Sequence, residues 1–179
     1  MTLGIVAGAG LLAISPASAQ NLGLPLPLEA TGRAALETGL DIAAATLANA
    51  LVASRDAAWA AGTQPIPAHI RAALLTHYPA DLLDSIEYRV GIAEDATIQS
   101  LSIRYGEATA VTTIDTITFA DPWDAENNIA LWAHEVKHVE QFRDWGVYEF
   151  ARRYVRDPEA VERDAYAVGA IFKALYGGG

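Results

Sequence analysis

Hydrophobic and polar residues recur with different periods in different parts of the chain. In the first half, apolar residues return every three or four positions, the spacing of one helix face. This stripe predicts a helix of about 25 residues, and its members are Leu36, Leu40, Ala44, Leu47 and Leu51. The segment "GTQPIP" ends this helix, and Pro67 begins a shorter one that extends to about Tyr78.

The period changes to two in the middle of the chain. "SIEYRVGIA" (85–93) alternates apolar with charged residues, "IQSLSIRYG" (98–106) does so less regularly, and "AVTTIDTITFAD" (110–121) is rich in β-branched residues. These segments predict two or three strands in a small sheet.

The last third returns to helical spacing. "DPWDAENN" leads into a long helix that contains "LWAHEVKHVEQFRDWG" and that ends or kinks at Gly146. "VYEFARRYVR" is a further helical piece, and Asp157 and Pro158 provide the N-cap and first position of a final helix over about 158–176. We therefore expect an α+β fold in which a short sheet lies beside the long helix, with additional helices at both ends.

The N-terminal end has the features of an export signal. Residues 1–19 carry no charged side chain, Pro16 interrupts the apolar run, and Ala17, Ser18 and Ala19 form an A-x-A cleavage sequence before Gln20. We expect cleavage there, an irregular leader over 20–32 and one domain over 33–176, in the periplasm or outside the cell. The alternative is an uncleaved apolar helix or anchor, but the run is shorter than the roughly 20 residues that span a bilayer. No stable membrane span is expected after cleavage.

Charge and cysteine content restrict the possible partners and metal ligands. The chain has 12 Lys and Arg against 22 Asp and Glu, a net charge of −10, which argues against nucleic acid as a partner because a phosphate backbone is bound by basic patches. It has no cysteine. A metal site must therefore use His, Asp and Glu.

Such residues stand close together in the long helix. His134 and His138 are four positions apart and share one helix face, so both imidazoles can contact a single cation. Glu135 lies beside that cation and can take a proton from a metal-bound water. This H-E-x-x-H pattern predicts one Zn²⁺ ion with Glu135 as general base; the alternative is a polar helix face without a metal.

Tetrahedral zinc needs a third protein ligand and leaves one position for water. Glu162 lies on the predicted final helix. It is a candidate if that helix packs against the helix that carries His134 and His138. Glu149, Glu159 and Asp164 compete with it, and spacing alone does not decide between Glu159 and Glu162.

The segment "LWAHEVKHVEQFRDWGVYEFARRYVRDPEAVERDAY" resembles the bacterial domain of unknown function 4157, also called the extracellular contractile injection system core domain. The family's H-E-L-x-H-V-x-Q core corresponds to residues 134–141, and "TIDTITFAD" resembles its preceding strand. "VERDAY" is similar to the Glu-x-x-Ala element of gluzincin peptidases. The resemblance covers about 85–170.

This resemblance implies a zincin-like metallopeptidase that hydrolyses peptide or protein substrates, with His134, His138 and Glu162 as ligands. Many gluzincins have a carboxylate one turn after the glutamate ligand, where this chain has Tyr166, which could orient a ligand or donate to an oxyanion. The alternative is a non-catalytic, metal-stabilised binding or assembly module, because fold does not determine function.

Several other residues are given structural or surface positions. We expect Gln141 to form structural hydrogen bonds, and His69 and His77 to be structural or on the surface. The expected packing aromatics are Trp123, Trp132, Trp145 and Tyr148. If 110–119 is a sheet edge that receives a substrate strand, Thr112, Asp115 and Thr118 would line its rim; a strand without a ligand is the alternative.

Overall fold

The computed structural model describes residues 26–91 and 109–177. Within these residues the chain forms seven helices and a four-stranded sheet, which together make an α+β fold, as the sequence predicted. The helices are α2 (Leu26–Ala61), α3 (Ala68–Leu74), α4 (Ala80–Asp84), α6 (Pro122–Asn127), α7 (Ile129–Trp145), α8 (Val147–Arg156) and α9 (Pro158–Tyr176). The strands are β1 (Gln64–Pro65), β2 (Glu87–Val90), β3 (Ala110–Thr113) and β4 (Thr116–Phe119).

The sheet is mixed, with the order β1-β2-β4-β3. Strands β2 and β4 are parallel, with Tyr88 opposite Ile117, whereas β1 with β2 and β3 with β4 are antiparallel. All four residues of β4 are buried. This central position explains why its sequence is rich in β-branched residues rather than strictly alternating.

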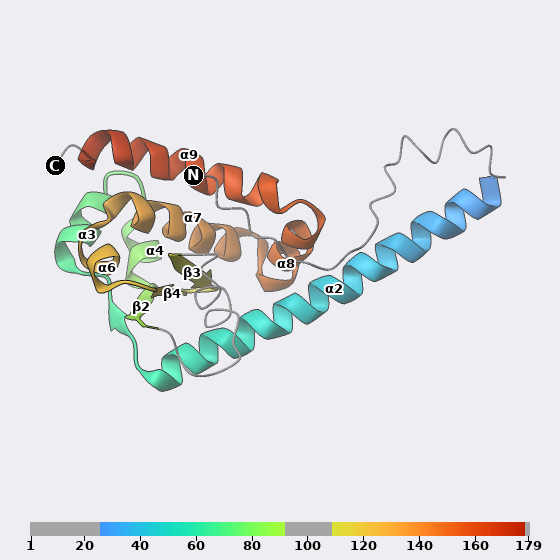
Figure 1. Ribbon diagram of the computed structural model, residues 1–179, viewed down its shortest axis with the longest axis horizontal. Coiled ribbons are helices and arrows are strands. Elements are labelled where there is room, and N and C mark those ends of the chain that lie inside the picture. The colour runs from blue at the N-terminus through green and yellow to red at the C-terminus, as the bar shows by residue number, and fades with distance from the viewer. Residues whose placement is uncertain (1–25, 92–108, 178–179) are drawn as a thin grey trace.

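The elements are stacked in layers (Figure 1): α9 packs on α7, α7 packs on the sheet, and the second half of α2 crosses the other side of the sheet. The main core lies between α7 and the sheet, where Trp132 contacts the rings of Tyr88 and Phe119. A second core, built around Leu51, Phe142 and Phe150, joins α2 to α8. The two cores hold α7 from both ends, which fixes the helix that carries the H-E-x-x-H segment.

Helix α2 is longer than the sequence predicted. It begins at Leu26, so 26–32, expected as irregular leader, is helical. Pro27 does not prevent this, because a first-turn residue needs no intrahelical partner for its amide. The apolar stripe is confirmed at Ala44 and Leu51, which are buried, but Leu36 is 54% exposed because the N-terminal end of α2 extends beyond the other layers (Figure 1).

Length and composition would allow residues 31–61 of α2 to cross a membrane. In the structure, however, the helix packs on protein along its second half, and Glu37 and Asp41 in its first half face α8. Arg152 contacts Asp41 at 2.9 Å and Glu37 at 3.4 Å. These ion pairs join the first half of α2 to α8.

The segment 110–121 is a hairpin and not one continuous strand. Ile114 and Asp115 form the turn between β3 and β4, and Ile114 has a φ of 63°. A β-branched residue rarely adopts this left-handed conformation, but two contacts hold the turn. Ile114 packs against the second core, and Asp115 pairs with Arg55.

The region before α7 also differs from the prediction. Residues 122–127 form the separate helix α6, whose N-cap Asp121 accepts a hydrogen bond from the amide of Trp123. The side chain of Trp123, expected to be a packing anchor, is 63% exposed, because Ala125 is the residue of α6 that enters the core. The predicted strand at 98–106 lies outside the described residues.

Candidate metal centre

Helix α7 has one face in the core and another toward α9. It starts at the cap Asn128, whose side chain accepts from the amide of Leu131, and ends at Gly146, which has a φ of 75°. Trp132 and Val136 are fully buried against the sheet. His134 and His138 therefore project from the adjacent face, one turn apart, as the four-residue spacing predicts.

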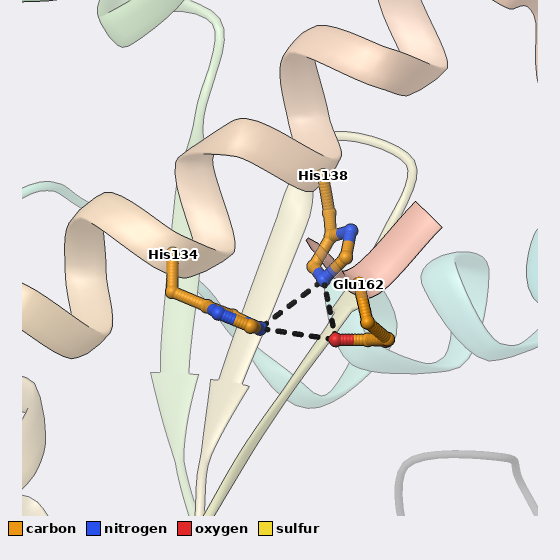
Figure 2. Close-up of side chains that lie close together, drawn as sticks. All are labelled: His134, His138 and Glu162. Atoms are coloured by element: carbon orange, nitrogen blue, oxygen red, sulfur yellow. Dashed lines mark hydrogen bonds and ion pairs between the residues drawn. The ribbon is translucent and has the colours of Figure 1, made fainter. Parts of the chain in front are cut away.

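The structure brings three predicted ligands together (Figure 2). His134 Nε2 lies 3.2 Å from His138 Nε2, and Glu162 Oε2 lies 3.4 Å from the first and 3.5 Å from the second. Glu162 comes from α9, opposite the two histidines. The three side chains form the only group of this kind within the described residues.

The spacing of these atoms fits one zinc ion. Zinc binds His nitrogen and carboxylate oxygen at about 2.0–2.2 Å in a tetrahedron, so two ligand atoms on one ion are separated by about 3.3 Å. The observed separations of 3.2, 3.4 and 3.5 Å agree with that value. Two imidazoles and one carboxylate are also the ligand set of many catalytic zinc sites.

The electrostatics of the cluster favour a charged Glu162. Burial acts to raise the pKa of Glu162, but contacts with His134 and His138 outweigh it and hold this pKa far below its usual range. Burial acts to lower the pKa of His138, but Glu162 and Glu135 raise it above the ordinary value. A concentration of negative charge around two imidazoles suits a divalent cation.

Close contact between α7 and α9 makes this arrangement possible. Ala165 is fully buried at the helix interface, and Gly169 follows it one turn later. A Cβ atom at Gly169 would lie 3.3 Å from the carbonyl oxygen of Ala130 and 3.4 Å from Cβ of His134. Small residues therefore let α9 approach α7 closely enough for Glu162 to reach both histidines.

Glu135 lies beside the cluster. Glu135 is only 4% exposed, and its Oε1 lies 4.0 Å from Nε2 of His134. Thr112 on β3 donates through Oγ1 to Oε2 of Glu135 at 2.7 Å. A carboxylate held next to the three candidate ligands, without being one of them, has the location that a general base requires.

Two further groups support the ligands. Gln141 was expected to form structural hydrogen bonds, and this is confirmed: it contacts His138 Nδ1 at 2.9 Å and the carbonyl oxygen of Val161 at 3.1 Å. The hydroxyl of Tyr154 on α8 donates to Oε1 of Glu162 at 3.3 Å, which leaves Oε2 directed at the histidines.

Tyr166 lies at the edge of the site. Its ring centre is 4.7 Å from that of His134, and the side chain is 56% exposed. Burial of part of the side chain, together with the charges of Glu162 and Glu135, raises the pKa of Tyr166, so the phenol stays protonated near neutral pH. It is available as a hydrogen-bond donor.

The competing acidic residues do not reach the cluster. Glu149 pairs with Arg153 at 2.9 Å, and Glu159 and Asp164 are exposed. Sequence reasoning missed Tyr154, which lies eight residues before Glu162 and carries no motif. It also considered Thr112 only as a possible rim residue and did not connect it with Glu135.

The sequence left open whether Thr112, Asp115 and Thr118 line the rim of a substrate-binding edge, and in the structure these three side chains do not form an exposed rim. Thr112 is buried against Glu135, Thr118 is 1% exposed because β4 is central in the sheet, and Asp115 is held in the turn by Arg55. The two histidines given structural or surface roles lie away from the cluster. His69 contacts the carbonyl oxygen of Glu126, and His77 packs against Tyr78 and Phe172.

In comparisons with known proteins, a family model matches part of the chain. No curated protein and no solved structure matches it. The family model described as the eCIS core domain matches residues 65–146, a range that begins and ends earlier than the resemblance over about 85–170. The match contains His134, Glu135 and His138 and ends before Glu162. The central part of this chain, residues 65–146, is thus similar to the eCIS core domain.

Proposed function

We propose that the chain is an exported zinc-dependent peptidase of zincin-like design. His134, His138 and Glu162 hold one zinc ion, and Glu135 is the general base. The observation that carries this proposal is the triangle of two Nε2 atoms and one Oε2 atom, 3.2–3.5 Å apart, with the Glu135 carboxylate 4.0 Å from one corner.

Each protein group has a defined task in this proposal. A bound zinc ion would supply Lewis acidity, lowering the pKa of a water ligand and polarising the scissile carbonyl. Glu135 accepts the proton of the attacking water and delivers it to the leaving amine. Its bond from Thr112 keeps one oxygen occupied, so the other is directed toward the ligands.

Tyr166 has a task suited to its exposed position. Its phenol is protonated near neutral pH and stands next to His134, and more than half of the residue's surface is exposed. A donor at this location can stabilise negative charge that develops on the substrate carbonyl oxygen. Peptides are the proposed substrates, and the net charge of −10 argues against nucleic acid.

The proposal is tested with Glu135→Gln, which keeps the size of the side chain but removes the base. We expect zinc content to equal that of the wild type and cleavage of a broad peptide library to fall by about 10²–10⁴-fold. Glu140→Gln is the matched control, since Glu140 is on the same helix but pairs with Lys137 at 2.6 Å. It should cleave normally.

Two outcomes would contradict the peptidase. Undiminished cleavage by Glu135→Gln would remove Glu135 as the base. A zinc-loaded wild type that cleaves no member of the library would instead favour the non-catalytic binding or assembly module, in which the ion only stabilises the fold.

A further inference from the structure

Gln141 bridges the two helices that carry the candidate ligands. It lies on α7, three residues after His138, and is 2% exposed. One end of its amide contacts Nδ1 of His138 at 2.9 Å, and the other contacts the main-chain oxygen of Val161 at 3.1 Å. Val161 immediately precedes Glu162 on α9. A single side chain thus contacts one ligand directly and the backbone beside another.

The second contact determines how the amide is oriented. A main-chain carbonyl oxygen can only accept a hydrogen bond, so the NH₂ group of Gln141 must face Val161. The amide oxygen Oε1 then faces His138. Since Oε1 can only accept, Nδ1 of His138 must carry the proton.

This orientation has a consequence for the other ring nitrogen. A neutral imidazole protonated at Nδ1 has its lone pair on Nε2. Nε2 is the atom of His138 that lies 3.2 Å from His134 Nε2 and 3.5 Å from Glu162 Oε2. The hydrogen-bond chain from Val161 through Gln141 therefore prepares the nitrogen that faces the ligand cluster.

We propose that Gln141 is a positioning residue that sets the tautomer of His138 and couples it to the register of α9 at Glu162. This inference rests on the proposed zinc site for its functional meaning. The tautomer itself, however, is a property of the metal-free protein and can be measured whether or not zinc binds.

The first test is nitrogen-15 NMR of His138 in metal-free full-length protein at alkaline pH, where the ring is neutral. The wild type should show the Nδ1–H form. Gln141→Met has similar length but no hydrogen-bonding group, and should shift the ring toward a mixture with the Nε2–H form. Gln141→Glu keeps an acceptor for Nδ1–H and should retain the wild-type tautomer. An Nε2–H ring in the wild type, or an unchanged ring in Gln141→Met, overturns the proposal.

The second test is zinc affinity, measured by competition with a chromophoric chelator. Loss of a group that orients a ligand costs about 10–100-fold in metal affinity, and we expect Gln141→Met to show this loss. Gln141→Glu should fall between it and the wild type, because a carboxylate cannot donate to Val161. Equal affinities for wild type and Gln141→Met would overturn the positioning role.

A matched control separates positioning from general loss of stability. Tyr78→Phe removes a buried hydrogen bond of 2.7 Å to the carbonyl oxygen of Ala133, also on α7, without touching a ligand. It should lower the melting temperature of the metal-free protein but leave zinc affinity unchanged. Wild type that binds no zinc would refute the proposed zinc site while the NMR result still decides the role of Gln141.

Discussion

Thr112 on β3 donates a 2.7 Å hydrogen bond to Oε2 of Glu135 on α7, across the interface between the sheet and the helix. Thr112 is 8% exposed and Glu135 4%, so the bond is protected from water. A buried carboxylate without a donor would be costly to keep ionised. The hydroxyl of Thr112 supplies such a donor and orients Glu135, the general base of the proposed mechanism.

Thr112→Val removes this donor with little change in shape. We expect kcat to fall about tenfold or more, because a hydrogen bond to a charged group contributes about 1.5–3 kcal/mol. Zinc content should stay at the wild-type level, since Thr112 contacts no ligand. Thr112→Ser, which retains the hydroxyl, should restore most of the activity. Loss of zinc together with activity would mean that Thr112 supports the whole site and not Glu135 alone.

The contact between Arg55 and Asp115 gives a prediction for pH dependence. Arg55 bonds both oxygens of Asp115, at 2.9 and 2.8 Å, and so ties α2 to the β3–β4 turn. Burial acts to raise the pKa of Asp115, but bonds from Arg55 and Thr116 bring it below the ordinary value. A lowered pKa means that this carboxylate stabilises the fold at neutral pH, and that the contribution is lost as pH falls through the folded-state pKa.

Asp115→Asn should therefore lower the free energy of unfolding by about 1–2 kcal/mol at neutral pH. The difference from the wild type should shrink below pH ~3.9, the ordinary pKa of aspartate. Denaturant titrations at several pH values measure it. Asp56→Asn is the control, since Asp56 also contacts Arg55 but its side chain is 63% exposed. A difference that persists in acid would contradict the ion-pair account.

Gly169 provides a test of the close approach between α7 and α9. Gly169→Val would push against the carbonyl oxygen of Ala130, only 3.3 Å from the Cβ position. We expect a loss of about 1–3 kcal/mol in stability, from overpacking, and weaker zinc binding because Glu162 is displaced. Gly39→Val on α2, where nothing lies within 4 Å, should be neutral or slightly stabilising. Similar losses of stability at Gly169 and Gly39 would argue that the close approach of α9 to α7 does not cause the loss.

The export prediction concerns the chain's N-terminus. Protein recovered from the periplasm or the medium should begin at Gln20, because the sequence before it has an A-x-A cleavage site. Mass spectrometry of the purified protein measures this. An intact Met1 on exported material would refute cleavage.

The sequence predicted the part of the site that one helix creates. The relative positions of His134, Glu135 and His138 follow from the helical period alone. The start of the final helix was predicted correctly from Asp157 and Pro158, and the side chain of Asp157 accepts a hydrogen bond from the amide of Ala160 at 3.0 Å. These features are local. Contacts between helices are not local, so sequence spacing could not separate Glu162 from Glu159. The family resemblance favoured Glu162, and the location of Glu162 next to both histidines agrees with that choice.

Other features depended on tertiary contacts that no short pattern records. The turn at Ile114 and Asp115 has no Gly or Asn, so the hairpin resembled one strand; the packing of Ile114 and the pairing with Arg55 stabilise it. Tyr154 likewise reaches Glu162 only because α8 and α9 pack together. The burial of Thr112 against Glu135 required the position of β3 beside α7.

The central claim is the shared ion, and metal analysis of the purified protein tests it most directly. We predict one zinc per chain in the wild type, and less than about one tenth of that amount in both His138→Ala and Glu162→Ala at limiting free zinc. Glu159→Ala, on the same helix but exposed, should retain the metal. Wild-type protein without zinc after purification in zinc-supplemented buffer, or Glu162→Ala with full occupancy, would contradict the account.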